Sequence, residues 1–361
     1  METIKKILFP LILILIPISV KAQSQQYISD SVIFYSKTDS VRFGGTVTKP
    51  LKGRNHTAIV LISGTGMQDR DGTMGNIRLF SIIADHLSKN GYVVLRMDDR
   101  GVGMTTGNYS ESTTYDFAQD ALQAVDFLKQ YPGVNPAKIG LLGHSEGGAV
   151  ISIAASMSKD IKFLISLSGL AMNGLDALIS QNEALVNNSS QKNRDKIRSN
   201  EINGLMFKTA YQYADSTNLE EKLNQTYKYW RQRDSVFFET QEDKYDHFRF
   251  PIWRYAQESA KPWYRFFVRY NAEMYLSHVM VPILAINGDN DNMVVPVNLK
   301  LWKKYAGRGA NINVTTILMP GLNHLLQPIQ NENEKTLIPP KTGISQEVLV
   351  TITDWLKKHN Q

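Results

Sequence analysis

The chain has 361 residues, of which 42% are hydrophobic and 20% are charged, and its formal net charge is +6. This ordinary globular composition excludes collagen-like, low-complexity and mainly disordered proteins. The sequence contains no cysteine, which excludes disulfides, thiolate metal sites and a cysteine nucleophile. The length allows two or three domains of ~150 residues each, or one α/β domain with a large insertion.

Residues 1–22 have the features of a secretory signal peptide. Lysines at positions 5 and 6 precede an apolar run over residues 7–16, and Val20-Lys21-Ala22 follows as a cleavage site. We expect cleavage after Ala22 and a periplasmic or secreted product without a stable membrane anchor. The alternative is an uncleaved anchor, but prolines interrupt the apolar run and it is shorter than the ~20 residues that span a bilayer.

The positive charge is spread along the chain. The sequence has no dense basic run and no nucleic-acid-binding motif, so the excess predicts a solvated surface and no nucleic-acid partner. It also has no sustained heptads and no internal repeat, which excludes a long coiled coil and a solenoid.

Two β-rich runs, residues 27–37 and 41–48, predict an antiparallel hairpin. Short apolar runs then alternate with helical stretches. The apolar runs, which we expect to be strands buried on both faces, are residues 58–63, 92–96, 138–142, 161–167, 281–287 and 312–318. The helical stretches are residues 79–90, 115–131, 146–157, 297–305 and 345–359. This alternation predicts a mostly parallel sheet of about eight strands with helices on both faces.

The alternation stops over residues 171–278. We predict that this segment is a helical insertion, and that residues 23–170 and 279–361 form the core. Residues 207–275 hold 19 of the 35 aromatic residues. Most buried aromatic residues pack rather than bind, so part of them should form the insertion's own core. We also expect the stretch to be a lid whose inner face lines an acyl pocket; the alternative is an insertion that only packs on itself.

The nucleophile is predicted from Gly143, Ser145 and Gly147, which match the pattern G-x-S-x-G between an apolar strand and a helix. In this pattern the serine occupies a sharp, strained turn, and the glycines let strand and helix approach closely. The hydroxyl then lies beside the helix N-terminus, where backbone N–H groups can stabilise an oxyanion.

A serine nucleophile needs a base, and seven histidines are available. His324 follows the last predicted strand, in a loop at the same sheet edge as Ser145, and is our predicted base. His144 adjoins the serine, but we expect it to point away and to pack. The other five lie before a core strand, on a helix, at the insertion or its edge, or in the C-terminal tail: His56, His86, His247, His278 and His359.

The acid that orients the base is predicted in the loop after residues 281–287. Asp289 and Asp291 both lie there, and catalytic groups of open parallel sheets gather at the carboxyl ends of strands. We choose Asp291, because a loop a few residues beyond the strand can curl under the imidazole; Asp289 is the rival. The chain order Ser145, Asp291, His324 is the one expected for a strand-turn-helix nucleophile.

The oxyanion hole requires two backbone N–H donors. Glu146 follows the nucleophile and supplies one, and we predict Thr65 as the other, with Gly66 as the alternative. The loop lacks the lysine of a phosphate-binding loop, which argues against nucleotide binding. We expect Arg70 and Arg100 to brace these loops by pairing with Asp69, Asp71 or Asp99. No group of residues has metal-ligand spacing, so we expect no metal and no cofactor.

Two segments together resemble a known family. Residues 63–72 read SGTGMQDRDG, and residues 143–148 read GHSEGG. The combination resembles bacterial carboxylesterases of the serine-aminopeptidase-like (S33-type) group in the α/β-hydrolase superfamily, whose oxyanion loop reads close to H/S-G-S-G-P-x-D-R-D-G. Two departures are Met67 where proline is common and Ser63 where histidine is common.

The resemblance covers residues 27–170 and 279–358 and implies an α/β-hydrolase fold with Ser145 as nucleophile, Asp291 as acid and His324 as base, and with Thr65 and Glu146 as oxyanion donors. We therefore predict a secreted serine hydrolase that cleaves small carboxylic esters through an acyl-enzyme. The alternatives on the same triad are a peptidase, which would need an anchor for a peptide terminus, and a thioesterase or acyltransferase. A non-catalytic binding protein is disfavoured because it has no need of all three residues.

Overall fold

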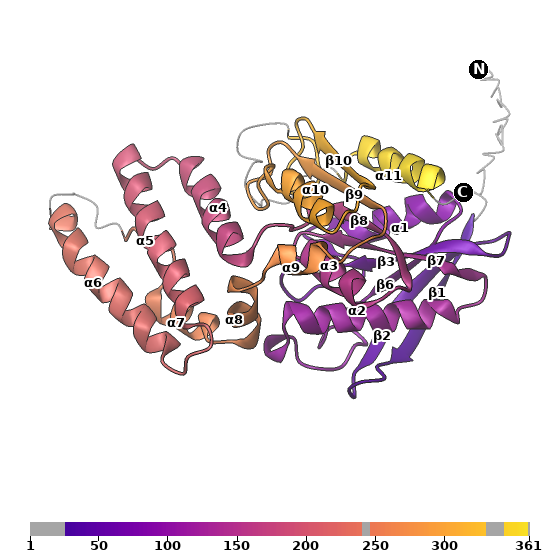
Figure 1. Ribbon diagram of the computed structural model, residues 1–361, viewed down its shortest axis with the longest axis horizontal. Coiled ribbons are helices and arrows are strands. Elements are labelled where there is room, and N and C mark those ends of the chain that lie inside the picture. The colour runs from indigo at the N-terminus through magenta and orange to yellow at the C-terminus, as the bar shows by residue number, and fades with distance from the viewer. Residues whose placement is uncertain (1–25, 240–245, 330–342, 360–361) are drawn as a thin grey trace, which may run out of the picture.

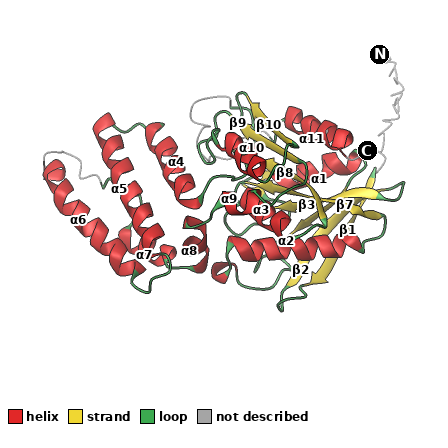
Figure 2. Cartoon of the chain, viewed as in Figure 1, coloured by secondary structure: helices red, strands yellow, loops and turns green. Residues whose placement is uncertain are grey.

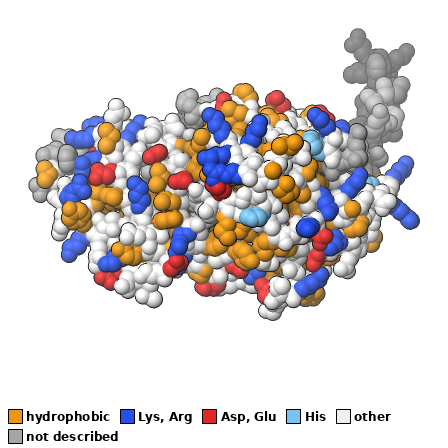
Figure 3. Space-filling model, viewed as in Figure 1, with side chains coloured by type: hydrophobic (Ala, Val, Ile, Leu, Met, Phe, Trp, Pro, Cys, Tyr) orange, Lys and Arg blue, Asp and Glu red, His pale blue; other side chains and the backbone are white. Residues whose placement is uncertain are grey.

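The computed structural model describes residues 26–239, 246–329 and 343–359. The segment predicted to be a signal peptide, residues 1–22, lies outside the described residues. Within the described parts of the chain, no helix is both long enough and apolar enough to cross a membrane. Basic and acidic side chains are mixed on the face shown in Figure 3.

An eight-stranded sheet forms the centre of the molecule (Figure 1). Its strands are β1 (Tyr27–Tyr35), β2 (Arg42–Pro50), β3 (His56–Ile62), β6 (Val93–Met97), β7 (Val134–His144), β8 (Ile161–Leu167), β9 (Ile283–Gly288) and β10 (Val314–Met319). Their order is β1-β2-β6-β3-β7-β8-β9-β10. β2 pairs antiparallel with β1 and β6, and all other pairs are parallel. The predicted eight-stranded, mostly parallel sheet is confirmed.

Two helical layers cover the sheet (Figure 2). α1 (Leu79–Lys89) and α11 (Gln346–His359) pack on one face, where their apolar side chains share a core with alternate strand residues. α2 (Thr114–Lys129), α3 (Gly147–Met157), α9 (Ala272–Leu276) and α10 (Asn298–Arg308) pack on the other. Strands such as β3 and β8 are thus buried on both faces over most of their length, which is why most of their residues are apolar.

Several elements and boundaries differ from the sequence prediction. β7 begins at Val134, earlier than the apolar run, because Val134 pairs with His56 of β3 before an irregularity in the register. β9 begins at Ile283, after Pro282, which has no N–H to donate to a ladder. A hairpin of two-residue strands, β4 (Thr73–Met74) and β5 (Ile77–Arg78), was not predicted, since two residues show no periodicity.

Between β8 and β9 the chain forms a helical lobe beyond the carboxyl ends of the strands (Figure 1). Its helices are α4 (Gly174–Asn187), α5 (Asn193–Tyr213), α6 (Leu219–Glu239), α7 (Ile252–Ser259) and α8 (Pro262–Val268). The lobe has a core of its own that includes Phe207, Trp230, Phe248, Tyr255 and Tyr264. α9 is different, because it packs on α3 and α10 of the sheet domain.

Candidate active site

Ser145 lies at the turn between β7 and α3 in a left-handed backbone conformation, with φ of 57°. Such a φ is strained for a non-glycine residue and is found at functional sites. A Cβ on Gly143 would collide with the carbonyl oxygen of Gly147, and a Cβ on Gly147 would lie 2.6 Å from the Ile62 carbonyl oxygen. Both glycines are therefore needed for the close approach of strand and helix that turns Ser145 outward.

His324 and Asp291 meet at the same edge of the sheet. The imidazole Nδ1 lies 3.0 Å from Asp291 Oδ1 and 2.9 Å from Oδ2, and both residues are buried. Asp291 Oδ1 also accepts hydrogen bonds from the backbone N–H groups of Met293 and Val294, at 2.8 and 2.9 Å. The carboxylate is therefore held in place independently of the histidine.

The rival carboxylate, Asp289, has different partners. Its Oδ1 accepts the backbone N–H of Gly321 at 2.7 Å and the side-chain amide of Asn290 at 2.6 Å. The bond from Gly321 joins the loop after β9 to the loop that carries His324. Of the two aspartates, the structure brings only Asp291 to the imidazole within the described residues, and Asp289 braces the loop.

His144 does not point away from the site, as the sequence prediction assumed. Its ring lies 4.9 Å from the ring of His324, and its Nε2 lies 3.1 Å from the His324 backbone carbonyl oxygen. Because a carbonyl oxygen only accepts, Nε2 carries the proton. Burial lowers the pKa of His144 to about 3, so this imidazole is neutral and supports the His324 loop through one hydrogen bond.

The structure distinguishes the two candidates for the second oxyanion donor. The backbone N–H of Gly66 donates to the hydroxyl of Tyr109 at 2.7 Å, in the short 3-10 helix Tyr109–Glu111. The backbone N–H groups of Thr65 and Glu146 donate to no other group in the described parts of the chain. The geometry therefore favours Thr65, the predicted donor, over Gly66.

Glu146 contributes a side chain whose surroundings the sequence did not reveal. The residue is 3% exposed, and its carboxylate accepts hydrogen bonds from Thr65 Oγ1 at 2.7 Å, Thr114 Oγ1 at 2.7 Å and Trp263 Nε1 at 2.8 Å. Burial raises the pKa of Glu146, and the three donors oppose that shift. The donors come from three segments far apart in sequence, so no local pattern could have identified them.

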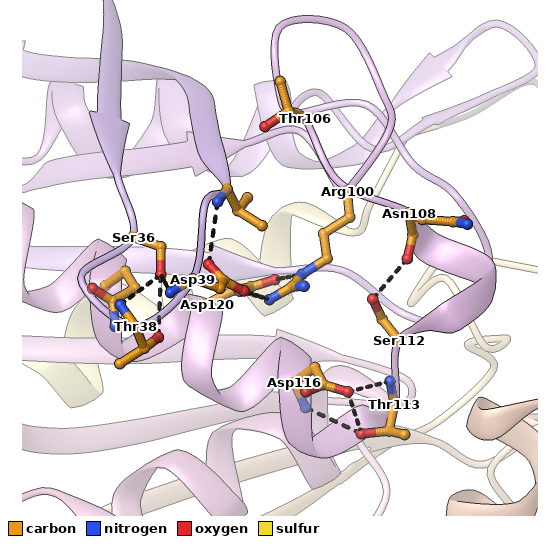
Figure 4. Close-up of polar contacts among 12 residues, drawn as sticks. Ser36, Thr38, Asp39, Arg100, Thr106, Asn108, Ser112, Thr113, Asp116 and Asp120 are labelled. Atoms are coloured by element: carbon orange, nitrogen blue, oxygen red, sulfur yellow. Dashed lines mark hydrogen bonds and ion pairs between the residues drawn. The ribbon is translucent and has the colours of Figure 1, made fainter.

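Arginines brace the loops around the site, but their partners differ from the predicted ones. Arg70 pairs with Asp98, at 3.0 Å from Nε to Oδ1. Arg100 pairs with Asp120 of α2 at 2.6 Å and with Asp39 at 3.1 Å (Figure 4). The Arg100 side chain thus joins the loop after β6 to α2 and to the β1–β2 turn, a set of contacts between elements that sequence spacing could not predict.

Asp69, Asp71 and Asp99, which were the predicted partners, have other contacts. Asp71 forms an ion pair with Arg96 of β6, and Asp69 accepts the backbone N–H groups of Asp71 and Thr73 at 3.0 and 3.1 Å. Asp99 accepts the hydroxyl of Ser63 at 2.7 Å and the backbone N–H of Gln68 at 2.8 Å. Asp99 therefore holds the oxyanion loop at its first residue and near its middle.

Removal from water raises the pKa of Asp99 to about 7; the hydrogen bonds from Ser63 and Gln68 oppose this shift, and the charges of Glu146 and Asp120 add to it. Between about pH 4 and 7 the folded protein then holds a proton that the unfolded chain has lost, so stability falls as the pH rises. The asparagine of the D99N variant does not titrate, so the stability of this variant does not fall with pH for this reason. We expect the melting temperature of D99N relative to wild type to increase from pH 5 to pH 8; a constant difference would show that Asp99 titrates normally.

A cavity of about 400 Å³ opens beside Ser145. His144, Glu146 and His324 line it at the catalytic end, and Thr65 and Gln68 line it on the oxyanion loop. Its apolar lining from the sheet domain includes Met74, Leu170, Met293, Val294 and Leu325. The helical lobe contributes Ala177, Leu178 and Gln181 of α4 and Trp263 and Phe267 of α8. Two helices of the lobe therefore form a wall of the pocket.

Only part of the aromatic stretch has the position expected of a lid. Of the described aromatic side chains in residues 207–275, Trp263 and Phe267 line the cavity, with ring centroids 4.9 Å apart. Others, such as Trp230 and Tyr255, pack inside the lobe's own core. The aromatic residues of the distal helices thus pack in the lobe's own core, and two aromatic residues of α8 line the cavity.

Within the described ranges, no group of three histidine, aspartate or glutamate side chains is arranged to hold a metal ion. His247, in the helical lobe, lies between two carboxylates, with Nδ1 2.8 Å from Asp234 Oδ2 and Nε2 3.1 Å from Asp195 Oδ1. These contacts join α5, α6 and the segment before α7 away from the cavity lining.

Comparison with known proteins gives both sequence and structural relatives. Esterase EstD of Thermotoga maritima is 26% identical over 317 residues, which are 87% of this chain and 65% of EstD, slightly less than two thirds of that relative. The esterase Pf2001 of Pyrococcus furiosus has a TM-score of 0.55 at 16% identity, with 92% of this chain and 91% of that chain covered. GrgF, an α/β hydrolase from Penicillium sp. sh18, has a TM-score of 0.56 at 15% identity, covering 92% and 99%.

The structural relatives confirm the α/β-hydrolase fold. A sequence-family profile described as X-Pro dipeptidyl-peptidase (S15 family) matches residues 17–325. The profile is not that of the S33-type group, so the finer resemblance drawn from the two motifs is not confirmed. The elbow at Ser145, the sheet order and this match together show that the chain is an α/β-hydrolase that belongs to the S15 family of serine hydrolases.

Proposed function

We propose that the protein hydrolyses carboxylic esters through an acyl-enzyme formed on Ser145. His324 Nε2 removes the proton of the serine hydroxyl, and Asp291 holds the imidazole with its proton on Nδ1. The backbone N–H groups of Thr65 and Glu146 stabilise the oxyanion of the tetrahedral intermediate. Protonated His324 then gives its proton to the leaving alcohol, and water releases the acid by the same steps in reverse.

The observation that carries this proposal is the chemistry of the cavity beside Ser145. Its described lining includes one carboxylate, Glu146, and that carboxylate already accepts three hydrogen bonds. No lysine or arginine side chain is among the described lining residues. A pocket of this kind favours a neutral apolar acyl group and offers no free anion to an α-ammonium group.

The family match favours a second candidate, a peptidase that releases X-Pro dipeptides. Such an enzyme must bind a charged peptide N-terminus, and burying an unpaired ammonium group is costly. The only carboxylate in the described cavity lining is that of Glu146, which already accepts three hydrogen bonds. We therefore rank ester hydrolysis first.

The two candidates are separated by a substrate panel on the purified protein. We expect hydrolysis of p-nitrophenyl esters and little turnover of X-Pro anilides with a free N-terminus. Thioesters belong in the panel because an 88-residue match, 36% identical, relates the chain to the thiohydrolase aneE of Aspergillus aculeatus. Cleavage of X-Pro anilides with a higher kcat/KM than any ester would overturn the assignment.

The cavity also predicts a dependence on acyl-chain length. Each buried CH₂ contributes ~0.8 kcal/mol, or up to ~4-fold in kcat/KM. We expect kcat/KM to rise from acetate to longer p-nitrophenyl esters until the pocket is full. Ala177→Leu adds volume to the α4 wall and should move the optimum to shorter chains, with little change for the acetate ester. A flat profile from acetate to octanoate would exclude α4 and α8 as the acyl-pocket wall.

Ala184→Leu is the matched control for this experiment. Ala184 lies two turns further along α4 and is not among the residues that line the cavity. The substitution adds the same volume to the same helix, so a general disturbance of α4 would appear in both variants. A shift of the optimum in both alike would count against the pocket.

We further propose that residues 1–22 direct export and are removed after Ala22. The support is the basic, apolar and small-residue order of that segment. N-terminal sequencing of the protein recovered from its native host tests the proposal. A mature protein that begins at residue 23 is expected, and one that retains residues 1–22 would contradict it.

A further inference from the structure

The Glu146 carboxylate has no task in the mechanism proposed above, which uses only the backbone N–H of this residue. A buried carboxylate is costly unless hydrogen bonds replace its lost water. Glu146 meets this condition with three donors, although an apolar residue at the same place would need none. The identity of those donors therefore indicates what the carboxylate does.

Two of the three donors belong to different parts of the site, the oxyanion loop and the wall of the acyl pocket. Thr65, which donates to Oε2, carries the other proposed oxyanion donor on its backbone. Trp263, which donates to Oε1, belongs to the acyl-pocket wall of α8. An indole N–H can only donate, so this contact requires an acceptor at that place.

We infer that the Glu146 side chain is a positioning group that ties the acyl-pocket wall at Trp263 to the oxyanion loop at Thr65. This inference rests on the proposed function, because it assigns Thr65 and Glu146 to the oxyanion hole. The same residue holds both parts in a fixed relation to Ser145, its neighbour in the chain.

An oxyanion hole stabilises the transition state only when its donors have the correct geometry. Its donors must lie within about 2.7–3.1 Å of the developing oxyanion, and removing one such donor costs ~10²–10³-fold in kcat. Thr65 is an exposed loop residue, and its side chain forms one hydrogen bond in the described structure, the bond to Glu146. Loss of that bond leaves the N–H present but less well placed.

Two conservative variants each remove one bond to the carboxylate. Thr65→Val keeps the side-chain shape and the backbone N–H, and Trp263→Phe keeps an aromatic wall. We expect each to lower kcat for p-nitrophenyl acetate and to weaken binding of a small alkyl boronic acid by ~10-fold, less than the loss of a whole donor. A boronic acid is informative because its tetrahedral adduct with Ser145 places an oxygen in the oxyanion hole.

The Trp263→Phe result separates positioning from simple packing. A wall residue that only packs against the acyl chain would change KM for long esters and leave kcat for acetate unchanged. Trp230→Phe is the control with the same substitution: Trp230 is buried in the core of the lobe and does not line the cavity, so its substitution should change neither quantity. In the double variant Thr65→Val/Trp263→Phe we expect less than the product of the two single effects, because both act through Glu146.

Substitution of Glu146 itself tests the nature of the group. In E146Q the amide oxygen can accept from Thr114 and Trp263 while the NH₂ donates to the Thr65 hydroxyl, so all three contacts are retained. We expect E146Q to recover most of the boronic acid affinity that E146A loses. If E146Q were as defective as E146A, the carboxylate would act by its charge and the positioning role would be wrong.

The outcomes distinguish this inference from the proposed function. Wild-type protein that neither hydrolyses any ester nor binds boronic acid would overturn both. Wild-type protein that does both, with a Trp263→Phe variant that is unchanged in acetate kcat and boronic acid affinity, would overturn only the role of Glu146. Independent, fully multiplicative effects of Thr65→Val and Trp263→Phe would overturn it too. Melting temperatures of all variants show whether each remains folded.

Discussion

Replacing Ser145 by alanine should lower ester hydrolysis by about 10⁴- to 10⁶-fold, the range found when a triad nucleophile is removed. The reason is local: the left-handed backbone at Ser145 places its hydroxyl in the cavity that His324 also lines. Alanine removes one oxygen and leaves the turn and its glycines intact, so the fold should be retained. Initial rates with p-nitrophenyl esters and labelling with a fluorophosphonate probe measure the effect.

Ser168→Ala is the control for this variant. Ser168 follows the neighbouring strand β8, also has a positive φ, of 47°, and is fully buried outside the cavity lining. It should therefore keep its activity and its fluorophosphonate labelling. Persistent labelling of the Ser145→Ala protein would remove Ser145 from the mechanism.

The sheet and its helices were predictable because strands that are buried on both faces appear in the sequence as short runs of mostly apolar residues. Most residues of β3, β8 and β9 are apolar, and helices such as α1 and α10 bury one apolar face. The early start of β7 and the β4–β5 hairpin show no such apolar pattern. Their positions depend on pairing with a neighbouring strand, which is a tertiary contact.

The residues of the site divide in the same way. Ser145 could be identified locally, because its turn demands glycines at fixed spacing. The choice of Asp291 over Asp289 depended on chain order and loop length. The structure now places Asp291 at the imidazole. The contacts of Glu146 and His144 could not be foreseen, because their partners lie far away in the sequence, His324 being 180 residues from His144.

The aromatic stretch shows a further limit of composition. Residues 207–275 are rich in aromatic side chains whether they line a pocket or pack in a lobe. On α8, Phe267 lines the cavity and its neighbour Phe266 lines a groove on the outside of the lobe. Only the orientation of the helix against the sheet domain decides between the two, and that orientation depends on contacts such as the one between Trp263 and Glu146.

Asp291→Asn should lower kcat by about 10⁴-fold, while Asp289→Asn should lower it far less. The hydrogen bonds of Asp291 explain the size of the first effect. Two backbone N–H groups donate to Oδ1, so the asparagine oxygen is expected at that position.

The asparagine NH₂ then takes the place of Oδ2, which lies 2.9 Å from His324 Nδ1. An NH₂ there donates to Nδ1 and moves the imidazole proton to Nε2, which can then no longer accept the proton of Ser145. Asp289 has no contact with the ring in the described structure, and its substitution affects only the bonds from the Gly321 backbone N–H and the Asn290 side chain. Rate measurements on the two variants, each shown to be folded by its melting temperature, test the assignment; a larger loss in Asp289→Asn would make Asp289 the acid.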